Sequence, residues 1–163
     1  MEGTVIIYTD GSSRGNPGPG GYGVVMLYNA HRKELSAGYR LTTNNRMELL
    51  AVIIALEALK QKHFHVKIYT DSRYIVDAVE KRWVFKWEGA GFHNKKNPDL
   101  WRRFLRLYRE YNVHFEWVPG HANVEWNERC DKLATTASWT TTPLVDDYYE
   151  EQEMENNAPG KII

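Results

Sequence analysis

Cysteine is almost absent from this sequence. Cys130 is the single cysteine among 163 residues, so no disulfide can form within the chain. The first residues, Met-Glu-Gly-Thr, also lack the basic and then apolar pattern of a secretory signal. Together these two features predict an intracellular, cytoplasmic protein.

Long apolar runs are absent as well. The longest one, Leu49 to Leu56, covers eight residues, whereas a membrane-spanning helix needs about 20. The sequence therefore predicts no membrane partner. It contains no visible internal repeat, and 163 residues with 42% hydrophobic content are typical of one domain that buries a real core.

The chain has no net charge, but its charges are unevenly distributed. Residues 1–139 hold 20 basic and 15 acidic side chains, whereas residues 140–163 hold six acidic side chains and Lys161. A basic body suits an anionic partner such as nucleic acid. The last segment is rich in acidic residues, Asn and Gly without periodicity, so we expect residues 1–139 to form the domain and 140–163 to be a largely disordered acidic tail.

Strand and helix patterns alternate along residues 4–138. Runs of β-branched and aromatic residues predict strands, and runs of helix formers predict helices. The stretch from Gly15 to Gly21 predicts a loop, because glycine is too free and proline donates no backbone hydrogen bond. The order β-β-β-α-β-α-α-β-α indicates an α/β fold, in which a five-stranded mixed sheet of three antiparallel strands and then parallel strands is flanked by helices. The predicted strands are 4–9, 22–28, 34–41, 66–70 and 113–118, and the helices are 47–59, 72 onward, 99–111 and 125–138.

Four carboxylates occupy positions that favour a metal site. Asp10 and Asp71 follow predicted strands, at the sheet edge where α/β proteins bind ligands. Glu48 and Asp131 lie on helices beside apolar faces, where an isolated charge is costly. Each one alone is more commonly a helix cap or a turn residue. A cluster of four favours Mg²⁺ or Mn²⁺, and two such ions can hydrolyse a phosphodiester. The absence of paired Cys and His residues argues against zinc.

The order of these motifs resembles type 1 ribonuclease H of the bacterial kind, over about residues 4–138. The resemblance implies a ribonuclease H-like fold and a monomeric endonuclease. Its activity would be hydrolysis of the RNA strand of RNA–DNA hybrids, leaving 5′-phosphate and 3′-hydroxyl ends. The segments that carry the resemblance are Tyr8–Ser12, Gly15–Gly23, Thr42–Leu49, Tyr69–Ser72, Trp117–Ala122 and Asn127–Asp131.

The resemblance also implies catalytic roles. The acidic metal site of the family falls on the same four carboxylates, Asp10, Glu48, Asp71 and Asp131, with Mg²⁺ or substitute Mn²⁺ and two ions when substrate is bound. His121 matches a mobile histidine that transfers a proton or assists product release. Its loss is expected to slow the enzyme while leaving some activity.

Further matched positions imply contacts with the hybrid. Thr43 matches part of a DNA-phosphate pocket, and Asn44 and Asn45 could equally be helix caps. Arg73 and Ser13 stand where family members often have Gln and Cys. The expected substrate-binding residues are Gly11, Ser12, Asn16, Thr43, Asn44, Asn45, Arg73 and Trp83.

Residues 80–110, here termed the basic arm, are expected to grip the DNA strand. This segment has nine basic and four acidic side chains, with tryptophans interleaved. The stretch 89–98 is shorter than in the best-known bacterial members, which predicts a weaker grip. Trp83 is the better candidate for substrate contact, whereas Trp87 and Trp101 are expected in the core.

Two alternatives and one open question accompany this interpretation. A non-catalytic hybrid-binding module on the same fold would not need four carboxylates and His121. An actin-like nucleotide-binding ATPase would need two such domains, for which 163 residues leave no room. The acidic tail could compete with nucleic acid for the basic arm, in which case deleting residues 140–163 should tighten hybrid binding at low salt.

Overall fold

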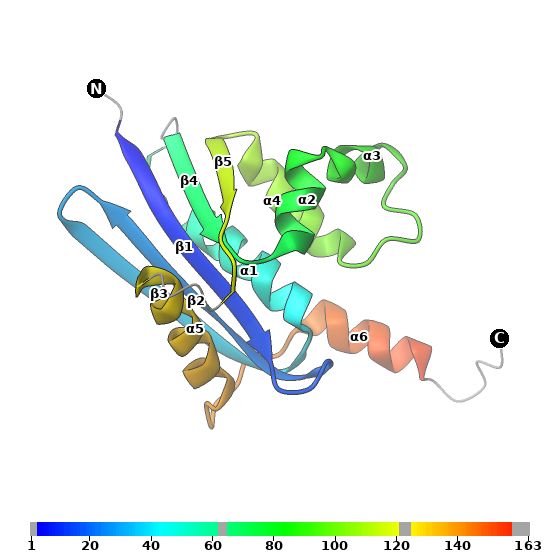
Figure 1. Cartoon of the computed structure of the whole chain (residues 1–163). Coiled ribbons are helices and arrows are strands. Elements are labelled where there is room, and N and C mark those ends of the chain that lie inside the picture. Colours follow the sequence, from blue (N-terminus) through cyan, green and yellow to red (C-terminus); the bar gives the residue numbers. More distant parts are fainter. Residues whose placement is uncertain (1–2, 62–64, 121–124, 158–163) are drawn as a thin grey trace.

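The computed structural model describes residues 3–61, 65–120 and 125–157. A five-stranded sheet in the order β3-β2-β1-β4-β5 runs through the molecule (Figure 1). The first three strands pair antiparallel, β4 pairs parallel with β1, and β5 pairs parallel with β4. This arrangement confirms the predicted mixed sheet. The strands are β1 (Thr4–Ser13), β2 (Gly18–Tyr28), β3 (His31–Thr42), β4 (His65–Thr70) and β5 (Asn112–Trp117).

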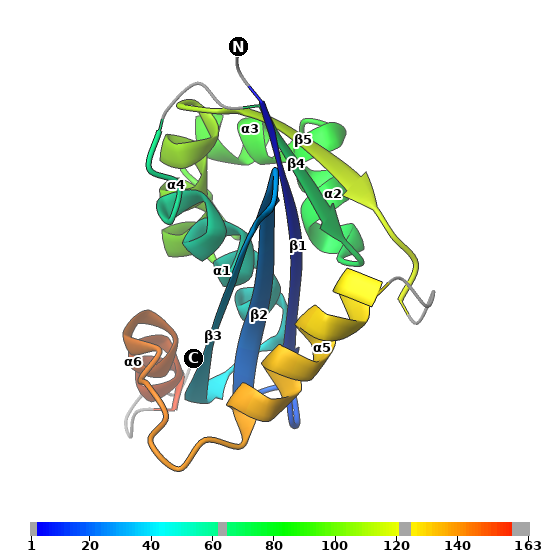
Figure 2. The same ribbon diagram turned by 90° about the vertical axis from the view of Figure 1, so that its left-hand side faces the viewer.

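Helices cover both faces of the sheet. Figure 2 shows α1 and α4 on one face and α5 on the other. The first of these helices is apolar on nearly all sides and is the centre of the core, with Leu49, Ile53 and Leu56 fully buried. The helices are α1 (Asn44–Glu57), α2 (Arg73–Glu80), α3 (Trp83–Gly89), α4 (Pro98–Tyr108), α5 (Glu125–Ser138) and α6 (Asp147–Asn156). No described helix is long and apolar enough to cross a membrane.

Three helices lie between β4 and β5, where the sequence predicted two. The break between α2 and α3 falls at Arg82, whose φ of 63° is left-handed and cannot continue a right-handed helix. A basic side chain at this position is not a typical helix breaker, so the sequence pattern concealed the boundary.

The glycine-rich segment is only partly a loop, which corrects the prediction. Strand β2 begins at Gly18, and Gly21 pairs with Ser12 of β1. A Cβ atom on Gly21 would lie 2.5 Å from the carbonyl oxygen of Ala134, and one on Gly23 would lie 2.3 Å from that of Cys130. These glycines are therefore strand residues that allow the backbone of α5 to approach the sheet closely.

The prediction that residues 140–163 are largely disordered is wrong for the part that the structure describes. Leu144 extends the edge of the sheet, because its N–H donates to Gly38 at 2.8 Å and its carbonyl accepts from Arg40 at 3.0 Å. The buried Asp146 then begins α6. Composition alone indicated disorder, but these long-range bonds to β3, and the bonds of Asp146 to Arg46 of α1, supply the stability that local propensity lacks.

Candidate active site

The register of the parallel strands brings Asp10 and Asp71 together. Tyr8 of β1 pairs with Tyr69 of β4, and their rings stack with centroids 4.7 Å apart. Each aspartate lies two residues beyond its tyrosine, where β4 has ended and β1 continues along β2. Both carboxylates therefore lie at the same height at the end of β4.

Gly11 places Glu48 beside this pair. A Cβ atom on Gly11 would lie 2.3 Å from the backbone nitrogen of Glu48, so only glycine allows the first turn of α1 to lie against β1. Thr43 is the N-cap of that helix, with its Oγ1 atom accepting from the Arg46 N–H at 3.2 Å. Asn44 and Asn45 are consequently the first helical residues rather than the caps.

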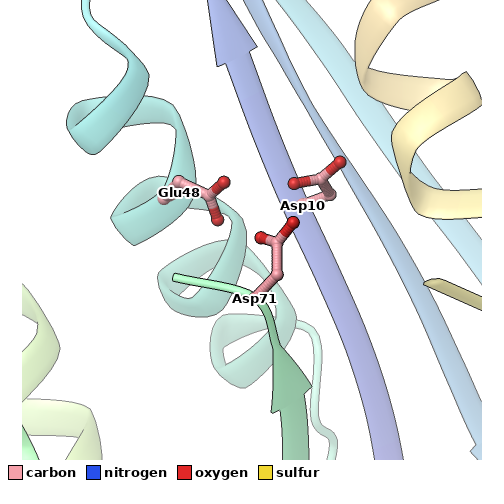
Figure 3. Close-up of side chains that lie close together, drawn as sticks. All are labelled: Asp10, Glu48 and Asp71. Atoms are coloured by element: carbon pink, nitrogen blue, oxygen red, sulfur yellow. The ribbon is translucent and has the colours of Figure 1, made fainter. Parts of the chain in front are cut away.

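Three carboxylates converge from three elements of the fold, as Figure 3 shows. Asp10, Glu48 and Asp71 each offer an oxygen atom, and these atoms lie within 4.8 Å of one another. Asp10 and Glu48 are buried. The Oε2 atom of Glu48 has no hydrogen-bond partner, which is costly for a buried polar atom. An oxygen-only donor set with an unsatisfied buried oxygen fits a hard divalent cation.

The pKa shifts of the clustered carboxylates are those expected of a site that binds a cation. Burial, followed by the charge of Asp71, raises the pKa of Asp10 to about 7, although a hydrogen bond with Glu48 acts in the opposite direction. Burial, followed by Asp10 and Asp71, raises the pKa of Glu48 well above its ordinary value. No basic side chain is among the main causes that shift either pKa. A bound cation would relieve both effects.

The remaining predicted catalytic residues lie beside the cluster or outside the described residues. Asp131 of α5 lines the same hollow and its charge also raises the pKa of Asp10, but it is not in the group of oxygens within 4.8 Å. His121 lies outside the described residues. Gly120, which precedes it in sequence, is close to the cluster, because a Cβ atom there would lie 3.2 Å from Asp71 Oδ2.

The predicted substrate-binding residues line three adjoining hollows. The first contains the carboxylates, together with Gly11, Ser12, Asn44, Asn45 and Arg73. The second contains Asn16, Thr43 and Asn45. The third contains Arg73 and Trp83, whose side chain is 41% exposed. Every substrate-binding residue predicted from the sequence therefore lies on this connected surface.

The aromatic and basic side chains of the basic arm divide into packed and exposed groups. Trp101 is fully buried and Trp87 packs against the core, as predicted. Two arginines are held by carboxylates, with Arg103 bonded to Glu57 and Arg109 to Glu88. Fewer charges of the arm are thus available for phosphates than the sequence count suggested.

Two residues of this surface were missed by the sequence analysis. The Tyr74 hydroxyl accepts hydrogen bonds from Trp101 Nε1 at 2.8 Å and Asn97 Nδ2 at 3.1 Å, and its side chain lines the first and third hollows. Arg46 lies beneath the second hollow. A tyrosine or an arginine within a helix is usually structural, so no local pattern singled them out.

Comparison with known proteins agrees with this geometry. The RNase H family profile matches residues 2–139. Ribonuclease H of Desulforamulus reducens is 60% identical over 139 residues, covering 82% of this chain and 87% of that protein. The structure of LC9-RNase H1, a type 1 RNase H with the type 2 active-site motif, is similar with a TM-score of 0.78 and 37% identity, covering 93% of this chain and 81% of that one.

A further solved structure includes a nucleic acid. LC11-RNase H1 in complex with an RNA/DNA hybrid has a TM-score of 0.61 and 33% identity, covering 82% of this chain and 95% of that one. The matches extend over most of each protein and agree with the strand order and the motifs. This chain belongs to the ribonuclease H family and is of type 1, as its sequence motifs predicted.

Proposed function

We propose that this protein is an endoribonuclease that hydrolyses the RNA strand of RNA–DNA hybrids, leaving 5′-phosphate and 3′-hydroxyl ends. The observation that carries this proposal is the convergence of Asp10, Glu48 and Asp71 within 4.8 Å, with a buried Glu48 oxygen that has no partner. Membership of the ribonuclease H family and a relative solved with an RNA/DNA hybrid support the substrate class.

The carboxylates would hold Mg²⁺, or Mn²⁺ as a substitute. When bound, two ions would supply the Lewis acidity needed to activate water on one side of the phosphodiester and to stabilise the leaving oxygen on the other. Asp10, Glu48 and Asp71 would contribute ligand oxygens, and Asp131 of α5 would complete the set. The Gly11 N–H, which bonds to the Glu48 carboxylate, holds that side chain in place.

Other residues would position the substrate and move protons. Gly11, Ser12, Asn44 and Asn45 line the hollow that contains the carboxylates, where they can bond the 2′-hydroxyls that distinguish RNA from DNA. His121 would accept or donate a proton near the scissile phosphate or assist product release. Arg73 stacks on Trp117, with its guanidinium carbon 3.7 Å from the ring centroid, at the edge of that hollow.

The second strand of the hybrid would lie over the other two hollows. Asn16 and Thr43 line one of them, and Trp83 and Lys96 line the other. We expect the protein to act as a cytoplasmic monomer that removes RNA primers and hybrids during DNA replication.

Cleavage of an end-labelled RNA strand tests the proposal. The RNA is offered single, paired with RNA or paired with DNA, with Mg²⁺ and with chelator. We expect cutting of the hybrid alone, abolished by chelator and by Asp71→Asn. The matched control is Asp147→Asn, the same change at an exposed acid of α6, which should cut like the wild type. Hybrid binding without cutting under Mg²⁺ or Mn²⁺ would instead support a non-catalytic binding module.

A further inference from the structure

Helix α6 forms one wall of a polar groove beside the active-site hollow. Figure 1 shows α6 below the loop that joins α3 to α4. The groove has a volume of about 530 Å³. Its opposite wall contains Asn16, Thr43 and Asn45, and the α3–α4 loop contributes Lys95 and Lys96. One face of α6 lines the groove, with Tyr148, Tyr149, Gln152, Glu153 and Asn156.

This wall is anchored by the buried Arg46. Its guanidinium group donates to Asp146 through Nε at 2.7 Å and through Nη2 at 3.0 Å. It also donates to Asp99 at 2.9 and 2.7 Å, and to Asn97 at 3.3 Å. All five N–H groups are therefore occupied. Arg46 joins α6 to α1 and α4, but it has no donor left for a ligand in the groove.

Several other polar groups of the groove remain available to a ligand. Gln152 and Asn156 make no side-chain hydrogen bond within the described part of the chain, and Lys96 has no ion pair there. The groove also contains the acidic Glu153, and burial, followed by the charge of Glu153, raises the pKa of Tyr149. The two amide side chains thus face the same space as Lys96 and as Lys95, whose Nζ atom lies 5.1 Å from the centroid of the Trp87 ring.

The groove is continuous with the site of the proposed reaction. Asn45 lines both the groove and the hollow that contains the carboxylates. Lys95 and Lys96 line both the groove and the hollow beside Trp83. A polymer with regularly spaced phosphates that enters the first hollow can therefore follow this surface past α6, whereas a small ligand would have no reason to touch all three hollows.

We propose that the inner face of α6 is an additional binding surface for the DNA strand of the hybrid. The amides of Gln152 and Asn156 donate hydrogen bonds to phosphodiester oxygens, while Lys95 and Lys96 supply the charge. This inference rests on the proposed function, and it assigns α6, residues 147–156, a role in the affinity of the protein for its substrate. The inference predicts that α6 strengthens hybrid binding, whereas a disordered acidic tail that competes for the basic arm would weaken it.

The double variant Gln152→Ala/Asn156→Ala tests this proposal. We expect its KM for a long hybrid to rise about 5-fold at unchanged kcat, because the lost hydrogen bonds contribute to binding and not to the chemical step. Met154→Ala on the outer face of α6, where the side chain is 73% exposed, is the matched control and should match the wild type. Circular dichroism of both variants establishes that α6 remains folded.

The salt dependence of hybrid binding distinguishes the contribution of the amide side chains from that of the lysines. Lys96→Ala should weaken hybrid binding and reduce the slope of log affinity against log salt by about 1, whereas the double variant should lower affinity without changing the slope. A hybrid whose DNA strand is trimmed until it no longer reaches α6 should be cut equally by the wild type and the double variant.

The outcomes distinguish this inference from the proposed function. Unchanged KM in the double variant would overturn the role of α6 while leaving hybrid cleavage intact. A lower KM would also overturn it and would make the helix a competitor of the substrate. Failure of the wild type to cut any hybrid would instead refute the proposed function.

Discussion

Two buried clusters of charge lie close together in this fold, and they are built in opposite ways. In one, Asp99 and Asp146 surround the guanidinium group of Arg46, and every N–H has a partner. In the other, the carboxylates of Asp10, Glu48 and Asp71 converge, and the main causes that raise the pKa values of Asp10 and Glu48 are burial and neighbouring carboxylates. Both clusters contain a residue of α1, since Arg46 and Glu48 lie three and five residues after its N-cap Thr43.

The difference shows which cluster is structural and which is functional. A buried ion pair whose hydrogen bonds are complete fixes neighbouring segments, because removing either partner leaves a buried charge unpaired. A cluster of like charges is unfavourable for the fold alone and is retained where a ligand supplies the opposite charge. We therefore expect substitutions in the two clusters to have opposite effects on activity and stability.

The largest expected effect is the loss of cleavage in Asp10→Asn. The amide keeps the shape of the side chain but removes a charge that the cation requires, so we expect activity to fall on the order of 1,000-fold. The thermal midpoint should stay the same or rise, because one repelling charge is gone. Cleavage of labelled hybrid and thermal melting measure the two effects, and a large loss of stability would contradict the contrast between the clusters.

Asp146→Ala should show the reverse pattern. The substitution leaves part of the Arg46 guanidinium group unpaired and removes the cap of α6, so we expect a loss of about 3 kcal/mol in the free energy of unfolding. Urea denaturation measures this change, with Asp147→Ala at the exposed neighbouring position as the control. Equal stability of the two variants would mean that Arg46 does not anchor α6.

A pH dependence of intermediate size follows from Asp10. Its pKa is about 7 in the folded protein without metal, against an ordinary value of 3.8. The folded state thus binds the Asp10 proton more tightly than the unfolded state does. The stabilisation that results from this proton is complete below pH 3.8 and is lost as the pH rises through about 7.

Mg²⁺ should therefore raise the thermal midpoint at pH 8 and have little effect at pH 5, where the proton competes with the cation. Thermal melting with Mg²⁺ or chelator at the two pH values tests this expectation. In the Asp10→Asn variant, the effect of Mg²⁺ on the thermal midpoint should no longer differ between pH 8 and pH 5. An equal stabilisation at both pH values would contradict protonation of the cluster.

The smallest expected effect is that of Arg40→Ala. Arg40 forms a bidentate ion pair with Glu150 of α6, but its side chain is 57% exposed and the pair is screened by solvent. We expect a loss of stability well below that of Asp146→Ala, which disappears at about 1 M salt. Urea denaturation at low and high salt measures the difference, and a salt-independent loss would indicate a buried role.

The sequence predicted the features that depend on local pattern. Alternating β-branched residues and the carboxylates after Thr9 and Thr70 were sufficient to predict the mixed sheet and the position of the acidic cluster. Strand ends are local, and parallel pairing then brings them together. The expectation that Trp101 lies in the core is confirmed, and the 41% exposure of Trp83 agrees with its choice as the candidate for substrate contact.

Features that depend on distant contacts were not predictable in this way. Gly21 was predicted to lie in a loop, because nothing in the local pattern shows that α5 packs against its strand. The order of residues 144–156 depends on Leu144 bonding to β3 and on Asp146 bonding to Arg46, residues about 100 positions apart in the sequence. Acidic composition indicated a disordered segment because it contains no information about these partners.

An NMR titration of the ¹⁵N-labelled wild type with Mg²⁺ tests the central claim most directly. The account predicts that amide shifts concentrate at Gly11, Glu48 and Asp71, although α6 presents more exposed acids. Shifts that centre on Glu151 and Glu155 of α6, or on the Arg46 cluster, with none at Gly11, would contradict the assignment of the metal site.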